Sequence, residues 1–93
     1  MPTLRVAHIR QQGQDMIIAP LDHSFEAKSQ DDQDSVISEI EAAAHSAGLR
    51  GSAVVVWQSG GRMKFIAPTP WHPFFRSISW QWVMANLNQT LTW

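Results

Sequence analysis

The segment from Ser29 to Leu49, SQDDQDSVISEIEAAAHSAGL, decides the fold class of this 93-residue chain. Ser29 stands three positions before Asp32, which is the spacing of a helix N-cap and its capping partner. Apolar residues then recur at helical spacing, at Val36, Ile37, Ile40, Ala43, Ala44 and Ala47. Gly48 followed by an apolar residue is typical of a left-handed helix stop. The segment therefore predicts an amphipathic helix from about Gln30 to Ala47.

A strand pair is expected on each side of this helix. Before it, apolar runs at residues 4–9 and 16–19 are separated by polar residues around Gly13, as in a β-hairpin. After it, the run AVVVW at residues 53–57 is separated from residues 63–67 by a turn that contains two glycines. The hairpins end alike, on Ile-Ala-Pro triplets at residues 18–20 and 66–68.

A final helix is expected between Pro73 and Leu91, burying Ile78, Val83, Met84, Leu87 and Leu91. The element order is then ββαββα, with two possible ββα half-repeats, 1–48 and 49–93, in a single domain spanning 1–93. This order predicts an α+β fold: a four-stranded antiparallel sheet with two helices on one face. The open second face would carry Ile17, Val55 and Ile66 beside Arg62 and Lys64.

Composition excludes several classes of protein. A hydrophobic content of 44% with 16% charged residues is that of a folded globular chain. The chain has no cysteine, so disulfides and thiolate metal sites are excluded. The four histidines form no metal-ligand spacing, and we expect neither a metal nor a cofactor. No signal peptide or membrane-spanning run is apparent, so a cytoplasmic protein without membrane contact is expected.

Charge is distributed unevenly along the chain. Residues 22–41 hold seven acids and one lysine, whereas the sequence after Glu41 has four basic residues and no acid. The basic residues are Arg50, Arg62, Lys64 and Arg76. A nucleic-acid-binding protein would need to gather them on one contiguous face, but their dispersion and a pI of about 6.4 argue against that alternative.

The string Trp71-His72-Pro73-Phe74-Phe75-Arg76 is the candidate ligand-binding segment. Trp71, His72, Phe74 and Arg76 could form an aromatic platform with a cationic rim, which suits a planar or anionic ligand. Alternatively, the prolines stiffen a connection while the aromatic side chains plug the core, with Phe75 buried.

An enzyme is the second alternative. Asp22 and His23 follow the first hairpin, and His72 follows the second, so all three could meet at one end of the sheet. Acid–base catalysis would require these groups within hydrogen-bond reach of one cleft. The sequence shows no catalytic signature, however, and we assign no catalytic residue.

The C-terminal segment predicts self-association. Between Ser77 and Trp93 there is no charged side chain, yet this stretch holds three of the five tryptophans. Trp80, Trp82 and Trp93 cannot all share one helix face, so at least one indole is left for a partner. We therefore expect a homodimer whose interface includes these tryptophans.

The second half of the chain resembles a known group of proteins. The motifs VVVW, GGRM, FIAP and WHPFF and the terminal Thr-Trp are similar to those of small uncharacterised bacterial proteins encoded by integron mobile gene cassettes. The resemblance covers roughly residues 32–93. It implies a short cytoplasmic protein that confers an accessory trait, and it implies no activity. The expected function is a non-enzymatic binding or interaction module with a protein or small-molecule partner.

Overall fold

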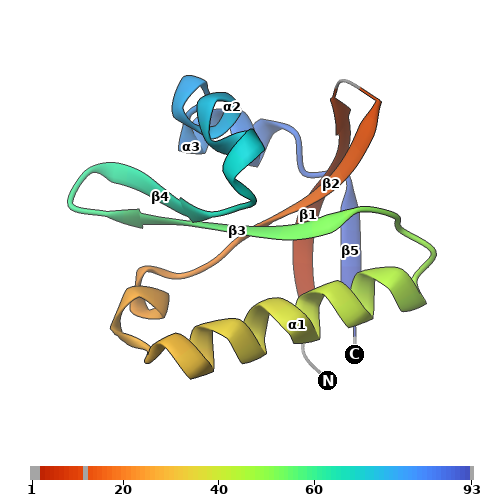
Figure 1. The fold of residues 1–93 in the computed structure, drawn as a ribbon, viewed down its shortest axis with the longest axis horizontal. Coiled ribbons are helices and arrows are strands. Elements are labelled where there is room, and N and C mark those ends of the chain that lie inside the picture. The colour runs from red at the N-terminus through yellow and green to blue at the C-terminus, as the bar shows by residue number, and fades with distance from the viewer. Residues whose placement is uncertain (1–2, 12, 93) are drawn as a thin grey trace.

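The structure, a computed structural model, describes residues 3–11 and 13–92. In this part of the chain the strands are β1 (Thr3–Gln11), β2 (Gln14–Pro20), β3 (Ser52–Ser59), β4 (Arg62–Ile66) and β5 (Gln89–Thr92). The helices are α1 (Gln30–Ser46), α2 (His72–Ser77) and α3 (Trp80–Ala85), with 3-10 helices η1 (His23–Ala27) and η2 (Thr69–Trp71). The α+β class is confirmed. Helix α1 covers one face of the sheet, and α2 and α3 lie over the other (Figure 1).

The sheet is mixed, and the predicted four-stranded antiparallel sheet is wrong. Its described strands lie in the order β4-β3-β2-β1-β5. β2 and β3 are parallel, paired from Met16 with Ser52 to Pro20 with Val56, while the other pairs are antiparallel. The reason is α1, because its 17 residues carry the chain back along the sheet, as a parallel pair requires.

Gly51 permits this parallel pairing. Its φ is +114°, and a Cβ built there would lie 2.3 Å from the backbone oxygen of Asp15 at the start of β2. Only glycine lets the chain enter β3 so close to its neighbour. In a four-stranded antiparallel sheet, Gly51 would not lie beside Asp15.

The predicted C-terminal helix is also wrong, because the chain divides it into two short helices and a strand. Ile78 and Ser79 have extended backbones, and the Ser79 side chain accepts a hydrogen bond of 3.1 Å from the Trp82 amide, which starts α3. Residues 89–92 then pair with β1, with Leu91 opposite Leu4. Two threonines flank Leu91, and β-branched residues favour a strand.

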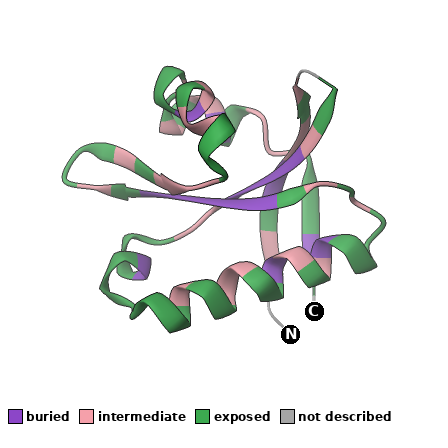
Figure 2. Ribbon diagram, in the orientation of Figure 1, coloured by how far each residue is buried: buried purple, intermediate pink, exposed green. Residues whose placement is uncertain are grey.

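Both sheet faces are buried (Figure 2). The face predicted to stay open, with Ile17, Val55 and Ile66, packs instead against α1 and η1. On the other face, Phe75 of α2 and Val83 of α3 are fully buried against Met16, Ile18, Val54 and Val56. Met84, predicted to be buried, is 43% exposed.

The first helix is confirmed almost to the residue. α1 spans Gln30–Ser46, and the Ser29 hydroxyl accepts a hydrogen bond of 3.2 Å from the Asp32 amide. Gly48 has a φ of +84°, as the left-handed stop requires.

Candidate functional site

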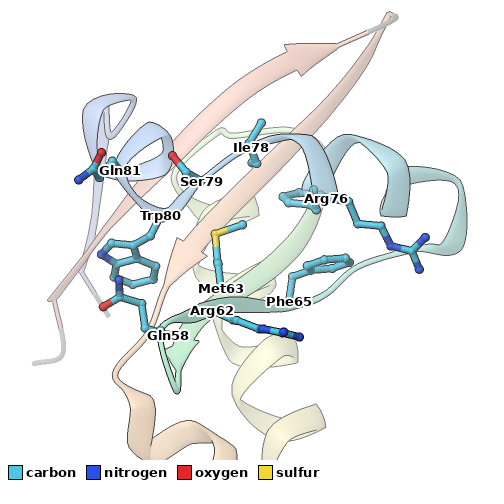
Figure 3. Close-up of a pocket in the computed structure, with 11 residues that line it drawn as sticks. Gln58, Arg62, Met63, Phe65, Arg76, Ile78, Ser79, Trp80 and Gln81 are labelled. Carbon is cyan, nitrogen blue, oxygen red and sulfur yellow. The ribbon is translucent and has the colours of Figure 1, made fainter.

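The main candidate site is a groove between the tip of the β3–β4 hairpin and the α2–α3 segment (Figure 3). It encloses about 620 Å³, within the range of small-molecule sites. We call it the arginine groove. Its lining residues come from β3, β4 and their turn, from α2, from the α2–α3 connection and from the start of α3: Gln58, Gly61, Arg62, Met63, Phe65, Phe75, Arg76, Ile78, Ser79, Trp80 and Gln81.

The walls of the arginine groove are apolar and aromatic. Met63 and Phe65 alternate along β4 and therefore face the same side of the sheet, toward α2 and α3. Figure 3 shows Met63 in the middle of the groove, with Trp80 and Gln58 on one side and Phe65 on the other. Phe65 in turn packs on buried Phe75, with ring centroids 5.3 Å apart. This packing restrains the aromatic wall before any ligand binds.

The charge of the groove is positive. Arg62 and Arg76 line it, both are exposed, and both lie on the Phe65 side in Figure 3. No carboxylate of the described chain is among the lining residues, and neither arginine has an ion-pair partner within the described residues. Because every lining residue lies after Glu41, the groove is built from the acid-free half of the sequence.

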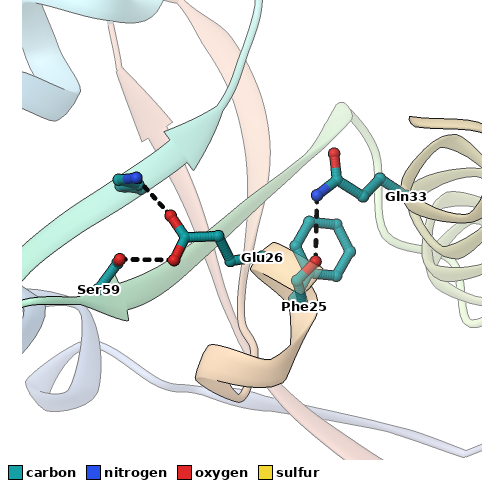
Figure 4. A network of polar contacts seen from close by, with 5 residues as sticks. Phe25, Glu26, Gln33 and Ser59 are labelled. Atoms are coloured by element: carbon teal, nitrogen blue, oxygen red, sulfur yellow. Dashed lines mark hydrogen bonds and ion pairs between the residues drawn. The ribbon is translucent and has the colours of Figure 1, made fainter. Parts of the chain in front are cut away.

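Lys64, two residues after Arg62 on β4, forms an ion pair with Glu26 that neutralises its charge (Figure 4). Lys64 donates to one oxygen of the Glu26 carboxylate, and the Ser59 hydroxyl donates to the other over 2.6 Å. The bond from Lys64, followed by that from Ser59, lowers the pKa of Glu26 below its ordinary value. In the same 3-10 helix, the Phe25 carbonyl accepts a 3.0 Å hydrogen bond from the Gln33 side chain. The network ties η1 to the β3–β4 hairpin that carries Arg62.

Of the four predicted ligand-binding residues, Arg76 lines the groove, whereas Trp71, His72 and Phe74 do not. The ring of His72 packs edge-on against Phe65 at 5.3 Å, and its Nε2 donates to the Ala67 carbonyl over 2.9 Å. Trp71 and Phe74 pack edge-to-face at 6.3 Å and join the hydrophobic cluster under α2 and α3. All three side chains are half-buried, so they support the wall that faces the groove.

The predicted interface tryptophans have different surroundings. Trp80 is half-buried and lines the arginine groove. Trp82 is half-buried and packs edge-to-face on Phe74, with centroids 5.7 Å apart. Trp93 lies outside the described residues.

The groups of the enzyme alternative are not brought together. His23 Nδ1 lies 3.2 Å from Asp22, and both side chains are largely exposed at η1, on the α1 side of the sheet. The Ser24 hydroxyl, followed by His23, lowers the pKa of Asp22. His72 packs on Phe65 on the opposite face. Within the described ranges no three histidine or acidic side chains converge as metal ligands would.

The four late basic residues do not form one face either. Arg50 precedes β3 and Arg62 follows it, so the strand separates them, and Lys64 is held by Glu26. Trp57 of β3, an aromatic side chain that could otherwise stack on a base, is buried against Phe25 with ring centroids 5.0 Å apart. Of the four, Arg62 and Arg76 are the two that line the arginine groove.

Sequence reasoning did not assign Gln58, Met63 or Phe65 to a binding site, and it assigned Trp80 to a dimer interface instead. The available signal was the absence of acids after Glu41 together with a hairpin whose second strand alternates basic and apolar residues.

Comparison with models of protein families, with curated proteins and with solved structures finds no match to this chain. None of the described helices has the length and apolar character needed to cross a membrane.

Proposed function

We propose that this chain is a small non-enzymatic binding module whose arginine groove holds a small organic anion with a planar, aromatic body. In this proposal the module is a cytoplasmic homodimer and the accessory product of a mobile gene cassette. One observation carries it: two arginines, neither with an ion-pair partner among the described residues, line an aromatic groove whose described lining holds no carboxylate.

The anionic part of the ligand follows from the chemistry of arginine. A guanidinium group offers paired N–H donors that match a carboxylate or phosphate and stays charged at every physiological pH. No described lining residue is an acid, so no carboxylate in this lining competes for these donors. An anion is therefore favoured over a neutral or cationic ligand.

The aromatic part of the ligand follows from the walls. Phe65 and Trp80 provide ring surfaces, and Met63 and Ile78 provide adaptable apolar contacts. Gln58, Ser79 and Gln81 add neutral polar groups that can fix the orientation of a ligand. A planar ring system that bears one or two acidic groups satisfies both parts of the groove.

The proposed homodimer is supported by the composition of the C-terminal segment. Its 17 residues from Ser77 carry no charge, and Met84 is 43% exposed on α3. Uncharged surface of this kind favours contact with an identical copy across a two-fold axis.

Calorimetric titration with 2-naphthoate, and with the neutral isostere 2-naphthamide, tests the binding proposal. We expect naphthoate to bind the wild type more tightly than naphthamide. Arg62→Gln and Arg76→Gln should each weaken naphthoate binding roughly two- to fivefold, as expected for an exposed charge contact.

Arg50→Gln is the matched control, because it removes the same charge at the far end of β3. It should leave the affinity unchanged. Equal losses in all three variants, or equal affinity for the acid and the amide, would show that the groove does not select anions.

A further inference from the structure

We infer that the second copy in the dimer pairs along the free edge of β5, so that two five-stranded sheets join into one continuous sheet of ten strands. This inference rests on the proposed homodimer and places its interface away from the tryptophans of α3. The occupant of the edge is a second molecule of this chain.

The β5 edge is open and uncharged. β5 is the last strand of the sheet and pairs only with β1 among the described strands. Its four residues, Gln89, Thr90, Leu91 and Thr92, carry no charge, and Leu91 is anchored in the core beneath α1. An unprotected edge presents backbone N–H and C=O groups to a further strand, and charged side chains are a usual protection against such pairing.

The opposite edge is protected in that way. β4 carries Arg62 and Lys64, two of its five residues. If β4 paired with its own copy, the two copies of Arg62, which has no ion-pair partner among the described residues, would lie on neighbouring strands, and like charges there are destabilising. The same pairing at β5 brings together only threonine, glutamine and leucine side chains. Self-complementarity therefore selects the β5 edge.

Neither face of the sheet blocks this edge. On the α1 side, a hollow of about 380 Å³ adjoins Thr92; it is lined by Glu39, Ala42, Ala43 and Ser46 of α1 and by Ala47, which caps that helix. On the other side, no residue of β5 belongs to the cluster beneath α2 and α3. A partner strand can approach without displacing a helix.

The nearest basic residue does not oppose the pairing. Arg5 lies on β1, opposite Thr90. In the joined sheet the two copies of Arg5 are three strand spacings apart, about 14 Å. That separation exceeds the screening length of about 8 Å at physiological salt. The joined sheet therefore keeps the two copies of Arg5 out of contact.

Sedimentation equilibrium from about 10 to about 500 µM tests the inference by giving a dimer dissociation constant. The double variant Thr90→Lys/Thr92→Lys places lysines opposite one another at the two-fold and should raise that constant roughly tenfold. The control Gln14→Lys/Ser52→Lys adds the same charge at exposed positions on interior strands and should leave it unchanged.

Hydrogen exchange of the wild type at the two ends of this range keeps the test independent of how the lysine variant folds. Amides of residues 89–92 should exchange more slowly at high concentration. A dimer with unchanged exchange there, or one that survives the lysines, would overturn the β5 interface alone. A monomer at every concentration would overturn the proposed homodimer as well.

Discussion

Glu26 illustrates how single side chains connect distant segments of this fold. Its carboxylate accepts from Lys64 and Ser59, and these bonds lower its pKa. Because the folded-state pKa lies below the unfolded value, the contribution of Glu26 to stability is complete above about pH 4.3. It is lost as the pH falls through the lowered folded-state pKa.

Thermal melts between pH 6 and pH 3 check this prediction. The melting temperature of the wild type should fall more steeply with acid than that of Glu26→Gln, which has no carboxylate to protonate. Ser59→Ala keeps the carboxylate but removes one donor, so its slope should lie between the two. Identical slopes for all three proteins would show that the network does not persist in solution.

Substitutions of Phe75 and His72 distinguish the two roles predicted for the Trp71–Arg76 string, namely ligand binding and core packing. Phe75 is 1% exposed, so Phe75→Ala should lower the free energy of unfolding by about 3–5 kcal/mol. His72 is half-buried with one hydrogen bond to Ala67, so His72→Ala should cost about 1 kcal/mol. Urea denaturation measures both, and a His72→Ala protein as unstable as Phe75→Ala would contradict this assignment.

Among the elements, α1 was predictable because its signals are local: the cap at Ser29, the apolar spacing and the stop at Gly48 all lie within one segment. The hairpins were predictable for the same reason. The C-terminal helix was mispredicted because the apolar residues from Ile78 to Leu91 fit a helical spacing. The extended backbone at Ser79 and the pairing of Leu91 with Leu4 decided against it. Such a pairing joins residues 87 positions apart, which periodicity cannot show.

Substitutions of two glycines in the α1–β3 loop, Gly48 and Gly51, test the parallel pairing of β2 and β3. Gly48 and Gly51 both have positive φ, but a Cβ at Gly48 meets no atom within 4 Å, whereas one at Gly51 overlaps the Asp15 backbone. Gly48→Ala should cost about 1 kcal/mol of stability, and Gly51→Ala should cost at least about 2–3 kcal/mol. Urea denaturation distinguishes them. Equal costs would contradict the close parallel approach of β3 to β2.

Over the whole molecule, the uneven charge noted in the sequence becomes a spatial division. The acids of residues 22–41 lie on η1, on α1 and in the segments beside them, while the arginine groove on the opposite side of the sheet is built from acid-free residues. The sequence showed this asymmetry but could not identify the groove. Gln58, Met63 and Trp80 meet only after the hairpin has folded against the α2–α3 segment.

The central claim is that the arginine groove is where this protein binds an aromatic anion. A ¹H–¹⁵N spectrum recorded during titration with 2-naphthoate tests it most directly, because Trp80 is the tryptophan among the lining residues. The indole N–H signal of Trp80, assigned through Trp80→Phe, and the amides of residues 61–63 and 78–81 should shift together, while those of residues 47–51 stay in place. Shifts confined to residues 47–51 or to β5, with the Trp80 signal unmoved, would contradict the account.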